Sequence, residues 1–214
     1  MPTLLDHLRE FNRKERFYLI GMALWNTKFR LSREFREALG DILELEVPED
    51  AFAAMDYHLD WIAASLQLAA DGDSPGPYPR DPRLMTATQE DIDLLVAYPE
   101  ANSYHLIMLE AKGVTAYSNS QLRSKIKRLN AVFFEGEAAK TARAIPHFAL
   151  TAPKPPKLLN VKDIPSWVLG KDGSFTCLPM KLPPVLKKVV RCYQDSRVSY
   201  QGEYWKVVRE RHTG

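Results

Sequence analysis

The sequence predicts an α/β protein with a mixed central sheet flanked by helices, and three patterns carry that prediction. Apolar residues recur at helical spacing in the first third of the chain. Two short apolar runs, 91–98 and 104–112, follow with only a short polar loop between them. After these two runs come a segment with helical spacing and a further apolar run. Together these patterns indicate strands and helices that share one core.

Length and composition are those of a globular protein with a single core. The chain has 214 residues, of which 45% are hydrophobic and 26% are charged, which is enough for one core and thin for two. No apolar stretch is long enough to cross a bilayer. The two cysteines, Cys177 and Cys192, lie far apart without a histidine nearby, which disfavours a zinc pair or a disulfide framework. We therefore expect a cytoplasmic protein without a membrane partner.

The N-terminal part, residues 1–47, reads as a helical layer packed on the core. One or two helices are expected over residues 3–24, and Ser32 is a suitable N-cap for the next helix. Pro48 suits the first turn of a further helix that runs to Ala70. Its apolar residues recur at steps of three and four: Phe52, Met55, Leu59, Ile62 and Leu66.

The two apolar runs form a β-hairpin with largely buried strands. If the turn is centred at 101–102, Asp93 falls directly opposite Glu110 and Asp91 falls opposite Lys112. Cross-strand partners share a face of the sheet, and facing carboxylates repel each other unless a cation lies between them. A divalent metal ion or Lys112 would supply that cation.

A helix and a strand follow the hairpin. Ser118 or Ser120 can cap the helix, which runs to Asn130. Its inner face holds Leu122, Ile126 and Leu129. Its outer face shows four cations: Arg123, Lys125, Lys127 and Arg128. A strand is then expected over residues 145–151.

The segment from Asp93 through the strand turn to Glu110-Ala111-Lys112 resembles the signature of the PD-(D/E)XK phosphodiesterase superfamily. The likeness spans residues 48–152, in the order acidic helix, hairpin, basic helix, strand. It implies a restriction-endonuclease-like fold. It also implies that Asp93, Glu110 and the Ala111 carbonyl bind Mg²⁺ or Mn²⁺, while Lys112 positions or activates the attacking water.

The resemblance points to two further positions. An acidic residue on the preceding helix often joins such a site, and both Asp56 and Asp60 are candidates. Gln121 resembles a polar position that some members place beside the metal. Oxygen ligands of this kind suit Mg²⁺ or Mn²⁺. The chain departs from the pattern because no proline precedes Asp93.

Charge is divided unevenly along the chain. Residues 1–110 hold 10 Lys and Arg against 20 Asp and Glu, whereas residues 111–214 hold 19 against 7. The basic half indicates a polyanion partner, and the four cations of the predicted outer helix face would form a track for phosphates. The alternative is that the two halves simply attract each other.

The last part of the chain, residues 153–214, is a basic extension interrupted by prolines. Several of its residues are of the types that stack on bases and neutralise phosphates in single-stranded nucleic acid. These are Arg191, Tyr193, Arg197, Tyr200, Tyr204, Trp205, Lys206 and Arg209. The commoner outcome is a terminal hairpin that packs its aromatic residues inward, with Val198 and Tyr200 facing Tyr204, Trp205 and Val207.

These patterns lead to a first hypothesis of a Mg²⁺-dependent nuclease that acts on DNA or RNA, with DNA placed ahead of RNA as the partner. A second hypothesis is a binding module of the same fold that holds nucleic acid without cleaving it. A third is a small factor whose acidic and basic faces dock on a protein. A homodimer remains open for all three.

Overall fold

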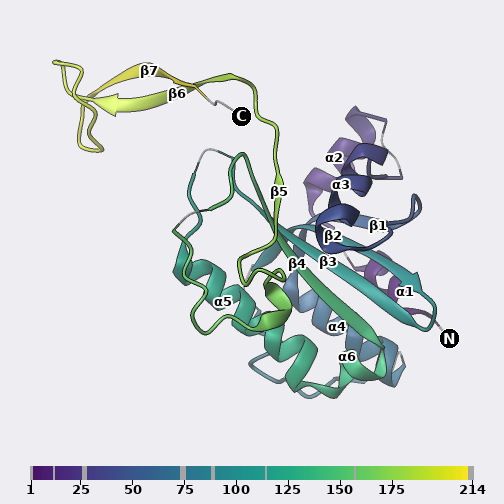
Figure 1. Cartoon of the computed structure of the whole chain (residues 1–214). Coiled ribbons are helices and arrows are strands. Elements are labelled where there is room, and N and C mark those ends of the chain that lie inside the picture. Colours follow the sequence, from purple (N-terminus) through teal and green to yellow (C-terminus); the bar gives the residue numbers. More distant parts are fainter. Residues whose placement is uncertain are drawn as a thin grey trace.

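A five-stranded sheet forms the centre of the protein, and a separate two-stranded arm projects from it (Figure 1). The computed structural model describes residues 2–11, 13–25, 28–72, 76–87, 90–113, 115–156 and 158–211. Within these ranges, three helices come first, and strands and helices then follow along the chain to form one sheet with helices packed on it. The predicted fold class, an α/β protein with a mixed sheet flanked by helices, is confirmed.

The strand order of the central sheet is the same as the chain order. Its strands are β1 (Phe52–His58), β2 (Asp91–Glu100), β3 (Ser103–Ala111), β4 (Ala144–Ala152) and β5 (Cys177–Pro179). Strand β2 runs antiparallel to both β1 and β3, whereas β3, β4 and β5 run parallel to one another. The carboxyl ends of β3, β4 and β5 therefore lie at one edge of the sheet.

The predicted hairpin and its register are confirmed. Pairing between β2 and β3 runs from Leu94 opposite Leu109 to Glu100 opposite Ser103. One further step along the same register brings Asp93 beside Glu110. Both strands are buried over most of their length, so a shift of one residue would move apolar side chains to the wrong face.

Helices cover both faces of the sheet (Figure 1). They are α1 (Leu4–Glu10), α2 (Glu15–Ala23), α3 (Arg33–Leu43), α4 (Leu59–Asp71), α5 (Asn119–Asn130) and α6 (Glu137–Thr141). A short π-helix, Ala131–Glu135, continues α5, and a 3₁₀ turn spans Ser166–Val168. As predicted, two helices occupy the first 24 residues, Ser32 caps α3 and Ser118 caps α5.

Two apolar clusters hold the layers together. Leu95 and Met108 lie on one face with residues of α1, α4 and α5. Val96 and Ile107 lie on the other face with Leu39 of α3. Both faces of the β2–β3 hairpin are therefore buried, as its nearly continuous apolar sequence predicts.

The single helix predicted from Pro48 to Ala70 is wrong in its first half. Residues 52–58 form β1, and only residues 59–71 form a helix. Phe52 and Met55 match helical spacing, but this segment pairs with the edge of β2 instead. The partner strand lies about 40 residues further on, so a tertiary contact outweighs the local pattern.

The predicted terminal hairpin also differs from the observed one. The arm consists of β6 (Val185–Cys192) and β7 (Tyr204–Arg211), whereas Val198 makes only a single bridge to Cys192. Its aromatic residues are exposed, with Tyr200 96% and Trp205 69% accessible. They do not pack inward because the arm projects away from the core (Figure 1).

Within the described ranges, no helix combines the length and the apolar character needed to cross a bilayer.

A chain of ionisable side chains crosses the opposite end of the sheet. Glu100 lies 2.8 Å from His105 Nε2, and His105 Nδ1 lies 2.9 Å from His147 Nε2. The two imidazole rings are stacked, with centroids 5.1 Å apart. Burial, assisted by the neighbouring His105, lowers the pKa of His147 to about 4.

This depressed pKa makes stability depend on pH. The folded state favours the neutral form of His147. The stabilisation of the fold by this group is therefore complete above pH 6.5, the ordinary pKa of histidine, and is lost as the pH falls towards 4. We expect this group to cost roughly 2 kcal/mol of unfolding free energy between these limits, because partial exposure reduces the full effect. Urea unfolding at both pH values should show a smaller pH dependence for His147→Gln than for the wild type. An identical pH dependence would contradict this origin.

Candidate functional site

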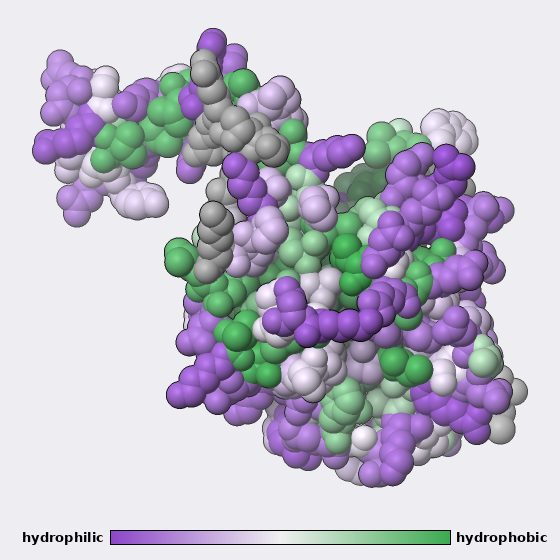
Figure 2. All heavy atoms as spheres, in the orientation of Figure 1, coloured by the Kyte–Doolittle hydropathy of each residue, from purple (hydrophilic) through white to green (hydrophobic). Residues whose placement is uncertain are grey.

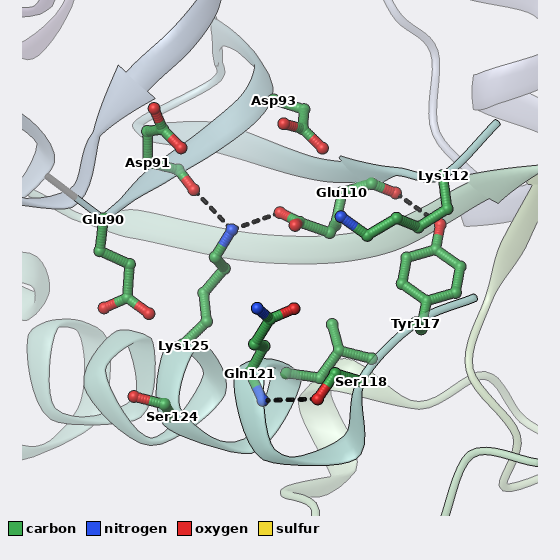
Figure 3. Close-up of a pocket in the computed structure, with 11 residues that line it drawn as sticks. Glu90, Asp91, Asp93, Glu110, Lys112, Tyr117, Ser118, Gln121, Ser124 and Lys125 are labelled. Atoms are coloured by element: carbon green, nitrogen blue, oxygen red, sulfur yellow. Dashed lines mark hydrogen bonds and ion pairs between the residues drawn. The ribbon is translucent and has the colours of Figure 1, made fainter. Parts of the chain in front are cut away.

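A pocket of about 370 Å³ lies between the β2–β3 end of the sheet and the first turns of α5 (Figure 3). Acidic residues and lysines dominate its lining. The charged residues are Glu90, Asp91, Asp93, Glu110, Lys112 and Lys125. Tyr117, Ser118, Gln121 and Ser124 add polar groups. Its volume is within the range of pockets that bind small ligands or part of a larger one.

Glu110 and Lys125 form a nearly buried ion pair at the floor of this pocket. The side chain of Glu110 is 12% exposed and that of Lys125 is 11% exposed. The Lys125 ammonium donates to the Glu110 carboxylate and also to the backbone carbonyl of Asp91, at 2.6 Å. Burial raises the pKa of Glu110, an effect that Lys125 opposes and the nearby Asp93 carboxylate reinforces. The lysine thus stabilises the charged form of a carboxylate in a desolvated position.

Asp93 is held beside Glu110 by the backbone of the neighbouring strand. The Ala111 N–H donates to Asp93 Oδ2 at 2.6 Å. In an extended strand the N–H and the C=O of one residue point to the same side, so the Ala111 carbonyl faces the β2 side of the strand as well. One Asp93 oxygen therefore has a fixed partner, while Oδ1 makes no hydrogen bond with another described residue.

Lys112 and Gln121 complete the pocket from opposite sides. Figure 3 shows the Lys112 side chain running back towards Glu110 and the Gln121 amide pointing up from α5 towards the same place. Neither the Lys112 ammonium nor the Gln121 amide makes a hydrogen bond or ion pair within the part of the chain that the structure describes. Both side chains are therefore available to a ligand in the pocket.

Tyr117 fixes the strand ends that carry these groups. Its hydroxyl lies 2.9 Å from the Glu110 carbonyl and 2.8 Å from the Thr151 carbonyl, and it accepts from the Thr151 N–H at 3.1 Å. Burial raises the pKa of this phenol, so the hydroxyl remains protonated and can donate. Lys112 N–H also donates to the Thr151 carbonyl at 2.9 Å. The end of β3 is thereby tied to β4 at the rim of the pocket.

The structure brings together Asp93, Glu110, Ala111, Lys112 and Gln121, as the sequence predicts. Asp91 contributes mainly through its backbone, since its carboxylate is bound by Lys14 of the N-terminal region and not by Lys112.

The two candidate acids of the preceding helix do not line this pocket. Asp56 lies on β1, where its φ is 51°, and its carboxylate is bound by Arg16 at 2.9 Å. Asp60 lies in the first turn of α4 and is bound by Arg128 and by the Ala87 N–H at 3.0 Å. The prediction that both share one helix is wrong, because the first half of that segment is a strand.

Two of the four cations predicted on the outer face of α5 lie inside the protein. Lys125 and Arg128 are 8% and 7% exposed. Arg128 binds Asp60, lies 3.4 Å from Glu90 and donates to the Leu84 carbonyl. Arg123 is partly covered, with a weak contact to Asp163 at 3.8 Å, and Lys127 is exposed. The predicted phosphate track on this helix is therefore reduced to Lys127 and part of Arg123.

Sequence reasoning missed the contributions of Glu90, Tyr117 and Lys125 to the pocket. For Lys125 a signal was present, because Gln121, Lys125 and Arg128 follow one another at steps of four and three. This spacing places them on a single stripe beside the apolar stripe of α5. A polar stripe next to a buried one indicates partners on another element. For Glu90 and Tyr117, which lie in loops, no periodic signal exists.

No protein-family model matches this chain, and no curated protein or solved structure matches it either. Its function must therefore be inferred from the site itself.

The ion pair at the pocket floor can be tested by its stability. Lys125→Met leaves the Glu110 carboxylate buried without its cation, and we expect a loss of roughly 3 kcal/mol of unfolding free energy at pH 7. Adding Glu110→Gln should restore most of that loss, because no unpaired charge remains. Urea denaturation of the single and double variants measures this coupling. Lys127→Met, an exposed control on the same helix, should stay within about 0.5 kcal/mol of the wild type; equal costs for Lys125→Met and Lys127→Met would contradict the pairing.

Proposed function

We propose that this chain is a Mg²⁺- or Mn²⁺-dependent nuclease with a restriction-endonuclease-like core, which hydrolyses phosphodiester bonds in DNA or RNA. The observation that carries the proposal is the meeting of Asp93 and Glu110, from adjacent strands, in one pocket beside Lys112, whose ammonium has no ion-pair partner among the described residues. The hairpin, α5 and β4 follow in the order that the sequence resemblance requires. Two free cysteines suit the reducing cytoplasm in which we place the protein.

The donor set of the pocket fits Mg²⁺. Among the described residues, no three His, Cys, Asp or Glu side chains form a group that could enclose a metal ion. Magnesium does not need such a cage, because it is usually bound by one or two carboxylates, with water and substrate phosphates in the remaining positions. Asp93, Glu110 and the Ala111 carbonyl would hold it here. A bound Mg²⁺ supplies positive charge against the phosphate and lowers the pKa of water.

The side chains of the pocket have separate roles in this proposal. The Lys112 ammonium donates hydrogen bonds to the attacking water and to a non-bridging phosphate oxygen, which orients the water towards phosphorus. Gln121 donates to the phosphate from the opposite wall. The water oxygen forms the new bond to phosphorus as the bond to the leaving oxygen breaks. The water gives its proton to surrounding solvent, and the leaving oxygen takes up a proton from solvent in turn. Lys125 acts on Glu110 alone, since it keeps that carboxylate ionised and oriented in a buried position.

One observation favours a second candidate, a module that holds nucleic acid without cleaving it. The Lys125 ammonium already neutralises Glu110, so a metal ion must share that carboxylate with a lysine. In a module without catalysis, this pair would simply replace the metal. Calorimetric titration of the protein with Mn²⁺ separates the two, because only the nuclease binds the ion in the pocket.

Neutralising either carboxylate should abolish cleavage. We expect Asp93→Asn and Glu110→Gln to reduce the Mg²⁺-dependent rate at least about 100-fold, since even contacts behind the ligands are worth 10- to 100-fold. Cleavage of a labelled oligonucleotide and calorimetry with Mn²⁺ measure the two losses. Asp41→Asn, an exposed carboxylate on α3, is the matched control and should retain both activities. Wild-type cleavage by either pocket variant would exclude this site.

Lys112→Ala should separate metal binding from turnover. Both metal-binding carboxylates remain, so Mn²⁺ affinity should change by less than about threefold, whereas the cleavage rate should fall by about 10² to 10⁴, the usual range for a positioned acid, base or donor. Calorimetry and single-turnover cleavage are measured on the same preparation, with Lys127→Ala as the control. Near-normal turnover would mean that Lys112 only balances the charge of the carboxylates.

A further inference from the structure

The arm formed by β6 and β7 is exposed over most of its length. It leaves the body after β5, and Figure 2 shows hydrophilic and hydrophobic residues side by side along it. Because Lys125 and Arg128 of α5 are internal, most of the exposed positive charge of the basic half must be sought elsewhere. The arm is where such charge gathers.

One face of the arm combines cations with apolar side chains and carries no acidic residue among those described. The register of β6 on β7 assigns alternate residues to this face. They are Val185, Lys187, Val189 and Arg191 on β6, and Trp205, Val207 and Arg209 on β7. All seven are exposed, with Val189 67% and Trp205 69% accessible. We call this set the basic arm face.

Two cations on the basic arm face lie directly opposite each other. Lys187 pairs with Arg209 across the ribbon, and neither side chain has an ion-pair partner among the described residues. Like charges at directly opposed positions destabilise an isolated sheet. A ribbon with two strands and no core beneath it gains little to offset this repulsion. An anion bound between the two side chains would turn the repulsion into attraction.

The arm begins at the edge of the sheet that holds the candidate site. Ala111 is aligned with Thr151 of β4, and Thr151 is aligned with Leu178 of β5. Two strand spacings, about 10 Å, therefore separate the end of β3 from the end of β5. Only residues 180–184 lie between β5 and the first residue of the arm. A long polyanion in the pocket could reach the arm without leaving this side of the protein.

We infer that the basic arm face binds the phosphate backbone of nucleic acid and holds it next to the pocket. Lys187 and Arg209 share one phosphate, Arg191 contacts another, and Trp205 lies against a base or a sugar. This inference rests on the proposed function for the identity of the polyanion, and it deepens that proposal by naming the surface that binds the substrate. The major groove of a duplex admits a two-stranded ribbon, and aromatic side chains stack on unpaired bases, so both forms offer the required backbone.

Binding can be measured without cleavage. Anisotropy titrations in EDTA would use a labelled duplex of about 20 base pairs and its single strand over a range of salt concentrations. The combined variant Lys187→Gln, Arg191→Gln and Arg209→Gln should flatten the slope of log K against log salt by about 2 to 3 for a duplex, since each lost phosphate contact removes about 0.9. Its affinity near 0.1 M salt should fall at least about tenfold.

A matched control removes the same charge from another part of the surface. The combined variant Lys140→Gln, Arg143→Gln and Lys162→Gln replaces three exposed cations outside the arm and the pocket. Its slope should stay within about 0.5 of the wild type. Trp205→Leu identifies the form of the ligand: a loss confined to the single strand assigns Trp205 to base stacking, and a loss on the duplex alone assigns it to the groove.

Three results would overturn the inference. Equal slopes for the arm variant and the control would mean that the basic arm face does not bind the backbone. Self-association of the wild type that the arm variant abolishes would make a second copy the occupant. Binding to anionic phosphatidylserine vesicles in preference to both oligonucleotides would make it a lipid surface. Cleavage is scored separately: a wild type that binds through the arm but never cleaves removes the proposed nuclease and leaves the arm assignment intact.

Discussion

The register of β2 on β3 is the constraint on which the candidate site depends. It brings Asp93 beside Glu110 and lets the Ala111 N–H fix the Asp93 carboxylate. Because both faces of the hairpin are buried, a slip by one residue would exchange side chains such as Leu95 and Val96 between the two apolar clusters and disrupt the packing of both. The hydrophobic core thus holds two mutually repelling carboxylates together, and the cost of that repulsion is met by Lys125 from α5.

The parts of this arrangement that could be predicted are those specified by local sequence. The hairpin follows from two apolar runs and a short turn, and the cap of α5 follows from Ser118. The strand β1 could not be predicted in this way, since Phe52 and Met55 fit helical spacing and their partners lie on β2. These residues form a strand because they pair with β2, and nothing in the sequence of residues 48–58 indicates that this partner is available.

The side chains of α5 illustrate a different limit. The sequence-based prediction divides this helix into an apolar inner face and a charged outer face, and so places every lysine and arginine of the helix in solvent. Lys125 and Arg128 lie inside because Glu110 and Asp60 on other elements balance their charge. A buried cation is tolerated only with such partners, so its place depends on contacts that sequence spacing can suggest but not identify. The arm shows the reverse case, since its aromatic residues have no core to enter and remain exposed.

The cations of the basic half, residues 111–214, fall into two groups: those paired with acids inside the fold and those exposed on the arm. Some cations of the basic half neutralise acids of the first half inside the fold, as Lys125 does for Glu110 and Arg128 does for Asp60 and Glu90. These ion pairs correspond to the alternative interpretation of the sequence, in which the acidic and basic halves attract each other. They contribute little to the electrostatic potential outside the protein. On the basic arm face, Lys187, Arg191 and Arg209 have no acidic residue opposite them within the described part of the arm. Charge that the fold does not neutralise must be balanced by ions or by a ligand, and the arm that carries these cations begins just after residues 180–184, which follow β5, at the end of the sheet that holds the pocket.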